Sequence, residues 1–252
     1  MIAMVYRSSN PVLSNKFWNN IDGHETMSYE GTMQKIGILF GTTFLFAALT
    51  AYAAISISMN LAMAAMVVGG ITGFILVLVL IFSRPKNPVP LMLSYAAFEG
   101  LFVGGISLTF EQMYEGIVFQ ATVGTMCIVG AMYGLYATRI IKATPMFQKV
   151  VISLVMGIGL LYVVSFILSF IPGSFQVPFL HSSGPMGILF SLFILGVASL
   201  LLILDFNFIE TGIQQRTPKV GEWWGAFGLL VTVIWIYIEM LRLLSKVRSN
   251  FD

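Results

Sequence analysis

Residues 71–82, ITGFILVLVLIF, contain no charged side chain, and their apolar residues do not alternate with polar ones. A strand of a membrane β-barrel alternates polar and apolar residues with a period of two, so this stretch lacks the pattern of such a strand. With the apolar residues that precede it, the stretch extends over residues 61–82. A helix of that length crosses a hydrocarbon core of about 30 Å, and we therefore predict a transmembrane helix here.

Runs of this kind occur seven times, with short connections between them that contain proline, glycine or charged residues. They cover residues 36–57, 61–82, 89–110, 117–138, 150–171, 186–206 and 223–244. We predict an all-α membrane protein in which a seven-helix transmembrane bundle spans residues 36–244. An N-terminal segment, residues 1–35, precedes the bundle, and a short tail, residues 245–252, follows it.

The composition of the chain supports a membrane protein. Of its 252 residues, 58% are hydrophobic and 10% are charged, whereas about 25% of the residues are charged in an ordinary soluble domain. This balance excludes a disordered chain and a polybasic nucleic-acid binder. We therefore expect membrane lipid, and no nucleic acid, around the protein.

Small residues indicate where helices pack closely in lipid. Gly100 and Gly104 are four residues apart, as are Gly130 and Gly134, and this spacing favours close contact between helices of the bundle. Cys127 is the only cysteine and cannot form an intramolecular disulfide bond. Because it lies in an apolar run, we expect it to be a small buried residue.

The thirteen Lys and Arg residues lie outside the apolar runs or at their ends. Positive charge occurs before the first run and in every second connection after it, which places the N-terminus in the cytoplasm. Arg242, Lys246 and Arg248 disagree, because they follow the odd-numbered last run. Either this run does not fully cross the membrane, or the earlier helices dominate the topology.

Three of the eleven acidic residues lie inside apolar runs: Glu99, Asp205 and Glu239. A charged side chain at the bilayer centre costs on the order of 2.5–3.5 kcal/mol or more, so such residues face a cavity, a partner or a proton. No basic residue lies among them, and carboxylate oxygens without compensating bases suit Ca²⁺ and can share a proton. The alternative is that Asp205 lies at the interface and Glu239 stays protonated among helices.

The basic residue best placed to meet an intramembrane acid is Arg84. It lies at the cytoplasmic end of the second run, on the side where the sixth run ends at Asp205. A salt bridge made or broken between the two side chains would change the packing of the last two helices.

The sequence contains no sign of an enzyme. It has no H-E-x-x-H motif and no Cys/His cluster for zinc, and Gly157 and Gly159 lie within a membrane run instead of following a strand. We expect no catalytic activity, no resident metal and no bound cofactor, with Ca²⁺ only as a permeating ion.

Two stretches resemble a known family. Residues 204–210, LDFNFIE, end the sixth run, and residues 235–244, WIYIEMLRLL, lie in the seventh. Together with seven short-looped helices, they look like the Bax inhibitor (transmembrane Bax inhibitor motif) family. Residues 9–13, SNPVL, and Glu222 and Trp223 further resemble its bacterial YccA-like branch, which implies a multi-pass protein of the bacterial inner membrane.

The resemblance implies a central last helix, a pH-sensitive Ca²⁺ leak, and a pair of aspartates from the last two helices that senses protons. Asp205 matches the first aspartate, and Glu239 stands where the second is expected. Arg84 matches a basic residue that can engage the first aspartate. Glu99 is an extra acid that extends an ion path or donates a hydrogen bond as a neutral group.

A direct pair of Asp205 and Glu239 places a demand on the last helix. A straight helix that starts at Trp223 carries Glu239 about 24 Å along its axis, at 1.5 Å per residue. The pair therefore requires the helix to begin later, near Gly225 or Gly228.

The leading hypothesis is a cation leak that closes at low pH. Loss of a proton from the Asp205 and Glu239 carboxyl groups would attract cations or break a closing hydrogen bond between them. A second hypothesis is a non-conducting interaction protein whose residues 1–34 are gripped by a membrane-bound AAA protease, a partner that the family's bacterial branch suggests. A third is a proton-coupled transporter.

Overall fold

The computed structural model describes residues 25–83, 85–169 and 182–250, and this part of the chain forms seven long helices. They are α2 (Tyr29–Ser56), α3 (Met59–Ser83), α4 (Val89–Met113), α5 (Ile117–Ala137), α6 (Pro145–Ser169), α8 (Pro185–Gln214) and α9 (Val220–Arg248). All seven contain stretches long and apolar enough to span a membrane. The predicted all-α seven-helix fold is confirmed.

Several helices extend beyond the apolar runs. Helix α2 begins at Tyr29, before residue 36, because the Ser28 hydroxyl accepts a hydrogen bond from the Gly31 backbone N–H (3.0 Å) and caps the helix. Helix α9 begins at Val220, before Gly225 and Gly228, and not after them as a direct pair of Asp205 and Glu239 requires. Hydropathy marks the part of a helix that suits lipid, whereas capping and packing set where the helix ends.

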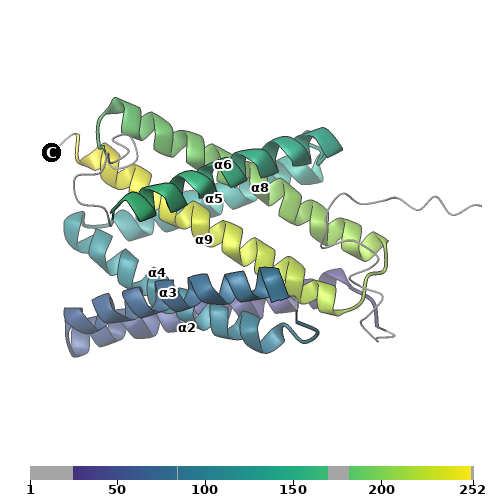
Figure 1. Cartoon of the computed structure of the whole chain (residues 1–252), viewed down its shortest axis with the longest axis horizontal. Helices are drawn as coiled ribbons and strands as arrows, with labels where there is room; N and C mark the ends of the chain where they lie inside the picture. Colours follow the sequence, from purple (N-terminus) through teal and green to yellow (C-terminus); the bar gives the residue numbers. More distant parts are fainter. Residues whose placement is uncertain (1–24, 84, 170–181, 251–252) are drawn as a thin grey trace, which may run out of the picture.

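Helix α9 lies at the centre of the bundle. Figure 1 shows it running diagonally between a group made of α2, α3 and α4 and a group made of α5, α6 and α8. It packs against α2, α4, α5 and α8, while α3 packs on α4 and α2 as an outer layer. In its most apolar stretch 50% of the residues are buried, against 11% in α6. The predicted central position of the last helix is confirmed.

The two ends of α9 meet opposite ends of the bundle. At its start, the Lys219 backbone N–H donates to the Glu25 carbonyl oxygen (3.0 Å), next to the beginning of α2. At its end, Arg248 Nη1 donates to the carbonyl oxygen of Glu115 in the α4–α5 connection (2.7 Å). The last helix therefore runs the length of the bundle, which favours the explanation that the earlier helices dominate the topology.

The glycine pairs behave differently. A Cβ atom on Gly100 would lie 2.5 Å from the Thr43 carbonyl oxygen of α2, and one on Gly104 would lie 2.7 Å from that of Ala47, so this pair allows close packing as predicted. A Cβ atom on Gly130 or Gly134 would meet no other described residue within 4 Å, so the prediction of close helix packing within the bundle is wrong for this pair.

Cys127 of α5 also departs from expectation, because it is exposed instead of buried. In a membrane helix an apolar residue suits lipid as well as a core, so hydrophobicity alone does not tell the two faces apart.

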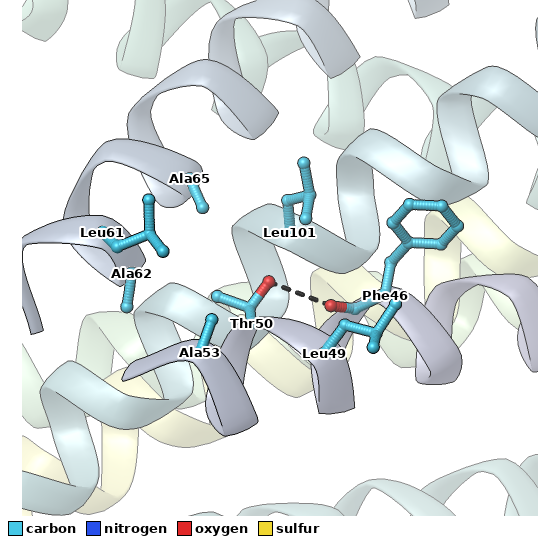
Figure 2. A pocket seen from close by; sticks show the side chains of 8 residues that line it. All are labelled: Phe46, Leu49, Thr50, Ala53, Leu61, Ala62, Ala65 and Leu101. Atoms are coloured by element: carbon cyan, nitrogen blue, oxygen red, sulfur yellow. Dashed lines mark hydrogen bonds between the residues drawn. The ribbon is translucent and has the colours of Figure 1, made fainter. Parts of the chain in front are cut away.

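An apolar groove of about 280 Å³ opens between α2 and α3 near their connection (Figure 2). Leu49 of α2, Ala62 of α3 and Leu101 of α4 are among its lining residues. Its one polar side chain, Thr50, donates to the Phe46 carbonyl oxygen (2.9 Å). The groove therefore offers no unpaired polar group, and it takes no part in the candidate site.

Candidate functional site: carboxyl groups along the last helix

One face of α9 presents a row of side chains to α8 and α6. The residues recur at alternating spacings of four and three, which places them on one side of a helix. This row, called the α9 seam below, consists of Gly228, Thr232, Trp235, Glu239, Arg242 and Lys246. Gly228 faces Asp205 of α8, and Glu239 contacts Tyr162 of α6. Two of the predicted acids therefore lie along the same face of the central helix.

The end of the bundle at which α9 begins is called the inner end below, and the end at which α9 finishes is called the outer end. Asp205 lies where α8 packs on the inner half of α9. Its Oδ1 atom is 3.3 Å from the place that a Cβ atom on Gly228 would occupy, and Thr232 lies beside the same carboxyl group. Its Oδ2 atom is buried and has no hydrogen-bond partner among the residues that the structure describes. An ionised carboxylate in this position would leave a buried oxygen uncompensated, so the present packing suits the protonated form.

Arg84, the predicted salt-bridge partner of Asp205, lies outside the described residues. Its contact with Asp205 remains a prediction.

Glu239 lies in the outer half of α9 and is fully buried, with 1% exposure. Its Oε1 atom accepts hydrogen bonds from the Tyr162 hydroxyl of α6 (2.7 Å) and from Arg242 Nη1 (2.9 Å), while Oε2 accepts none in the described part of the chain. The Arg242 guanidinium also stacks over the Tyr162 ring, 5.3 Å from its centroid. Glu239 therefore has a cation within ion-pair distance.

The prediction that no basic residue lies among the acids is wrong for Glu239. Arg242 stands three residues further along the same helix, a spacing at which side chains on a helix meet. That spacing is visible in the sequence, but the position of Arg242 near the end of an apolar run made it appear to belong to the membrane surface.

Asp205 and Glu239 do not form a pair. Asp205 faces Gly228. Glu239 lies eleven positions after Gly228 on the same continuous helix, which is about 16 Å along the axis at 1.5 Å per residue. The late start of α9 that a direct pair requires is absent, since the helix already begins at Val220. The two acids share a face of α9 at different depths.

Glu99 lies apart from the α9 seam, between α4 and α3. Its Oε2 atom is 2.8 Å from the place that a Cβ atom on Gly73 of α3 would occupy, and the side chain interacts with the Tyr95 hydroxyl one turn earlier on α4. Of the two roles expected for Glu99, this contact favours the hydrogen-bonded acid.

Glu222 is a further acid, fully buried at the inner end of α9, that was not among the predicted site residues. Its Oε1 atom accepts hydrogen bonds from the Ser28 backbone N–H (3.1 Å) and hydroxyl (2.9 Å), and its Oε2 atom lies 3.2 Å from Lys35 Nζ. Gly31 makes room for it, because a Cβ atom there would lie 2.0 Å from Oε1. Glu222 clamps the start of α2 to the start of α9. It lies just outside the apolar run, which is why hydropathy did not single it out.

A second ion pair lies near the inner end of α8. Glu210, five residues after Asp205, accepts a hydrogen bond from Arg139 Nη1 (3.0 Å) and another from the Tyr136 hydroxyl. The hydrogen bond and charge of the Glu210 carboxylate raise the pKa of Arg139 above its usual value. Glu210 thus has a cationic and a hydroxyl partner, and it can be compared with Asp205, whose Oδ2 atom has no hydrogen-bond partner among the described residues.

No group of three His, Cys, Asp or Glu side chains that could hold a metal ion occurs within residues 25–83, 85–169 and 182–250. A Ca²⁺ ion with its usual six to eight oxygen ligands would therefore meet these carboxyl groups one at a time.

The chain matches the family model described as "Bax inhibitor 1 like" over residues 10–249, a range that includes all seven helices and the three predicted acids. Comparison with curated proteins gives no match, and comparison with solved structures gives none either.

Proposed function

The chain belongs to the Bax inhibitor 1 like family, and from this premise we propose that it is a pH-sensitive leak for Ca²⁺ or a similar cation, with Asp205 as its proton switch. Seven apolar helices make it an integral multi-pass membrane protein. The resemblance to the family's bacterial branch supports a bacterial inner membrane, and the charge alternation of the connections supports a cytoplasmic N-terminus.

The observation that carries the proposal is the Oδ2 atom of Asp205, which is buried against the central helix and has no hydrogen-bond partner among the described residues. An ionised buried carboxylate with one oxygen uncompensated is costly, whereas the protonated group is neutral. Protonation therefore favours the packed arrangement of α8 on α9, and loss of the proton favours any arrangement that admits water or a cation. Low pH closes the leak.

Glu239 has a different part in this proposal. Arg242 Nη1 lies 2.9 Å from its Oε1 atom, so the Glu239 carboxylate has a cationic partner within the described part of the chain. A cation that moves along the α9 seam meets Glu239 as a fixed outer carboxylate. Glu99 is outside the path, because it faces α3.

The test is Ca²⁺ flux into liposomes that contain the purified protein, measured at about pH 6, 7 and 8. Asp205→Asn keeps the shape of the protonated acid but cannot ionise, so we expect flux to be low and equal at all three values. Wild-type protein should conduct more as the pH rises.

Glu210→Gln is the matched control, because it makes the same carboxyl-to-amide change five residues away, on an acid that already has partners. It should retain the pH response. An unchanged pH response in Asp205→Asn, or its loss in Glu210→Gln alone, would remove Asp205 as the switch.

The interaction with a membrane-bound AAA protease remains the alternative proposal. Glu25 to Ser28 are already bonded to the α8–α9 region, through Glu25 to Lys219, Met27 to Thr217 and Ser28 to Glu222. A partner would therefore grip residues 1–24. Absence of flux at every pH, with loss of a copurifying protease when residues 1–24 are deleted, would favour this alternative.

A further inference from the structure

Between Thr232, which lies beside Asp205, and Glu239, the α9 seam contains only Trp235. On α8, the residues between Ser191 and Asp205 that face the core include Leu195, Ala198 and Leu202, each at most 5% exposed, and the Ser199 hydroxyl donates to the Leu195 carbonyl oxygen (2.7 Å). At the outer end, Lys246 Nζ donates to Ser191 Oγ (2.9 Å) and to the Gly187 carbonyl oxygen (3.2 Å). A path along the seam therefore has its charged groups at the two ends and mainly apolar side chains in its middle.

Trp235 occupies this middle. It stands three residues after Thr232 and four before Glu239, so its level on α9 is between those of the two carboxyl groups. Its side chain packs against two separate apolar clusters. One contains Leu195, Ala198 and Leu202 of α8, and the other contains Ile158 of α6 with Ile194 and Val197 of α8.

We infer that Trp235 is the constriction that separates the outer carboxylate Glu239 from the proton switch Asp205. The inference rests on the proposed cation leak and adds the residue that blocks its path. An apolar constriction stops ions because water does not fill it, and an ion that enters loses its hydration. A large ring held between two apolar clusters meets this description.

The neighbours of Trp235 indicate how the constriction opens. One of its two clusters includes α6, the helix with the smallest buried share in its apolar stretch. Tyr162 is the polar link of α6 to the seam, through its hydrogen bond to Glu239. A shift of α6 away from α9 would remove packing from one side of the ring while the α8 side stays in place.

The first arm of the test is Ca²⁺ flux through a graded series at this position, Trp235→Phe, Trp235→Leu and Trp235→Ala. Smaller side chains should raise flux at pH 6, where the wild type is closed, by on the order of tenfold for alanine. Trp223→Ala is the matched control. It removes a half-buried tryptophan from the same helix, but one that packs on the α2–α4 side at the inner end, and it should leave flux at pH 6 low.

The second arm measures water access and does not depend on ion flux. Thr232→Cys, in a chain whose Cys127 is replaced by serine, is exposed to a membrane-impermeant thiol reagent from the side of Lys246. With Trp235 present the new cysteine should react slowly, and Trp235→Ala should raise the reaction rate by on the order of tenfold. Trp235→Phe serves if the alanine variant does not fold, with a smaller rise.

The two arms separate the failure of this inference from that of the proposed function. Unchanged thiol access and unchanged flux at pH 6 in every folded Trp235 variant, beside a wild type that conducts with the expected pH response, would overturn the constriction and leave the leak intact. A rise in thiol access without any flux at any pH would support the constriction and overturn the leak. Equal effects of Trp223→Ala and Trp235→Ala would reduce Trp235 to a packing residue.

Discussion

The inner and outer halves of the α9 seam each hold one buried acid, and the two acids differ in their partners. Asp205 faces Gly228 with one oxygen unpaired, whereas Glu239 lies 2.9 Å from a guanidinium nitrogen of Arg242. In lipid an acid alone is a candidate for a proton, whereas an acid with a cation is a candidate for a fixed charge. Under the proposed function, the partners of an intramembrane acid, and not its presence alone, indicate which acid is the proton switch.

The largest effect on stability should come from breaking the outer pair. Arg242→Met leaves Glu239 buried without its cation and should cost about 3 kcal/mol of unfolding free energy, the lower end for removing one partner of a buried pair. Glu239→Gln should cost about 1 kcal/mol, because the Arg242 side chain is 33% exposed and remains hydrated. Denaturant unfolding in detergent measures both.

Equal losses of unfolding free energy for Arg242→Met and Glu239→Gln would mean that the ion pair contributes little.

Crowding beside the buried Glu222 carboxylate should destabilise the contact between α2 and α9. Gly31→Ala places a Cβ atom 2.0 Å from Glu222 Oε1, and the shift of this clamp should cost about 2 kcal/mol. Gly37→Ala and Gly41→Ala on the same helix meet no neighbour within 4 Å and should stabilise it by up to about 1 kcal/mol. Thermal unfolding of the three variants checks the contrast, and similar shifts for all three would contradict it.

Gly228→Ala should separate the effect on flux from that on stability. The added Cβ atom would lie 3.3 Å from Asp205 Oδ1, so the carboxyl group moves by a few tenths of an ångström and the helix gains propensity; the net change should stay within about 1 kcal/mol. The methyl group narrows the space beside the acid, and flux at pH 8 should fall. Unchanged flux would mean that ions do not pass this side of Asp205.

The smallest effect on stability should come from the exposed ion pair of Glu25 and Lys219. The hydrogen bond and charge of Lys219 lower the pKa of Glu25 from its usual 4.5, so the folded state binds this proton less readily than the unfolded chain. The contribution of the pair is therefore complete at neutral pH and is lost as the pH falls through the lowered pKa. Glu25→Gln should melt slightly below wild type at pH 7, and the difference should shrink as the pH falls toward 3. A difference that grows at pH 3 would contradict this sign.

Much of the fold could be predicted from the sequence, because each helix carries its own signal in hydropathy. The run that contains residues 71–82 became α3, and the other six runs each became one helix. The orientation of helix faces could not be predicted in the same way. Cys127 and Gly130 are apolar and small, but they face outward, since lipid accepts the residues that a core accepts.

The candidate site was predicted only in part. Burial cost singled out Asp205 and Glu239 as acids inside apolar runs, and the structure places both along α9. The two acids are separated because α9 is one unbroken helix from Val220 to Arg248. The glycines at 225 and 228 had suggested that this helix starts later. Glu222 was missed, because its partners come from residues 28–35, almost two hundred positions away in the chain.

The most direct test of the central claim compares the two acids in one experiment. Ca²⁺ flux into liposomes is titrated from about pH 6 to pH 8 for Asp205→Asn and Glu239→Gln beside the wild type. The account predicts that Asp205→Asn loses the pH response, whereas Glu239→Gln keeps the same midpoint with a smaller amplitude. Loss of the response in Glu239→Gln, with retention in Asp205→Asn, would contradict the assignment of the switch to the unpaired acid.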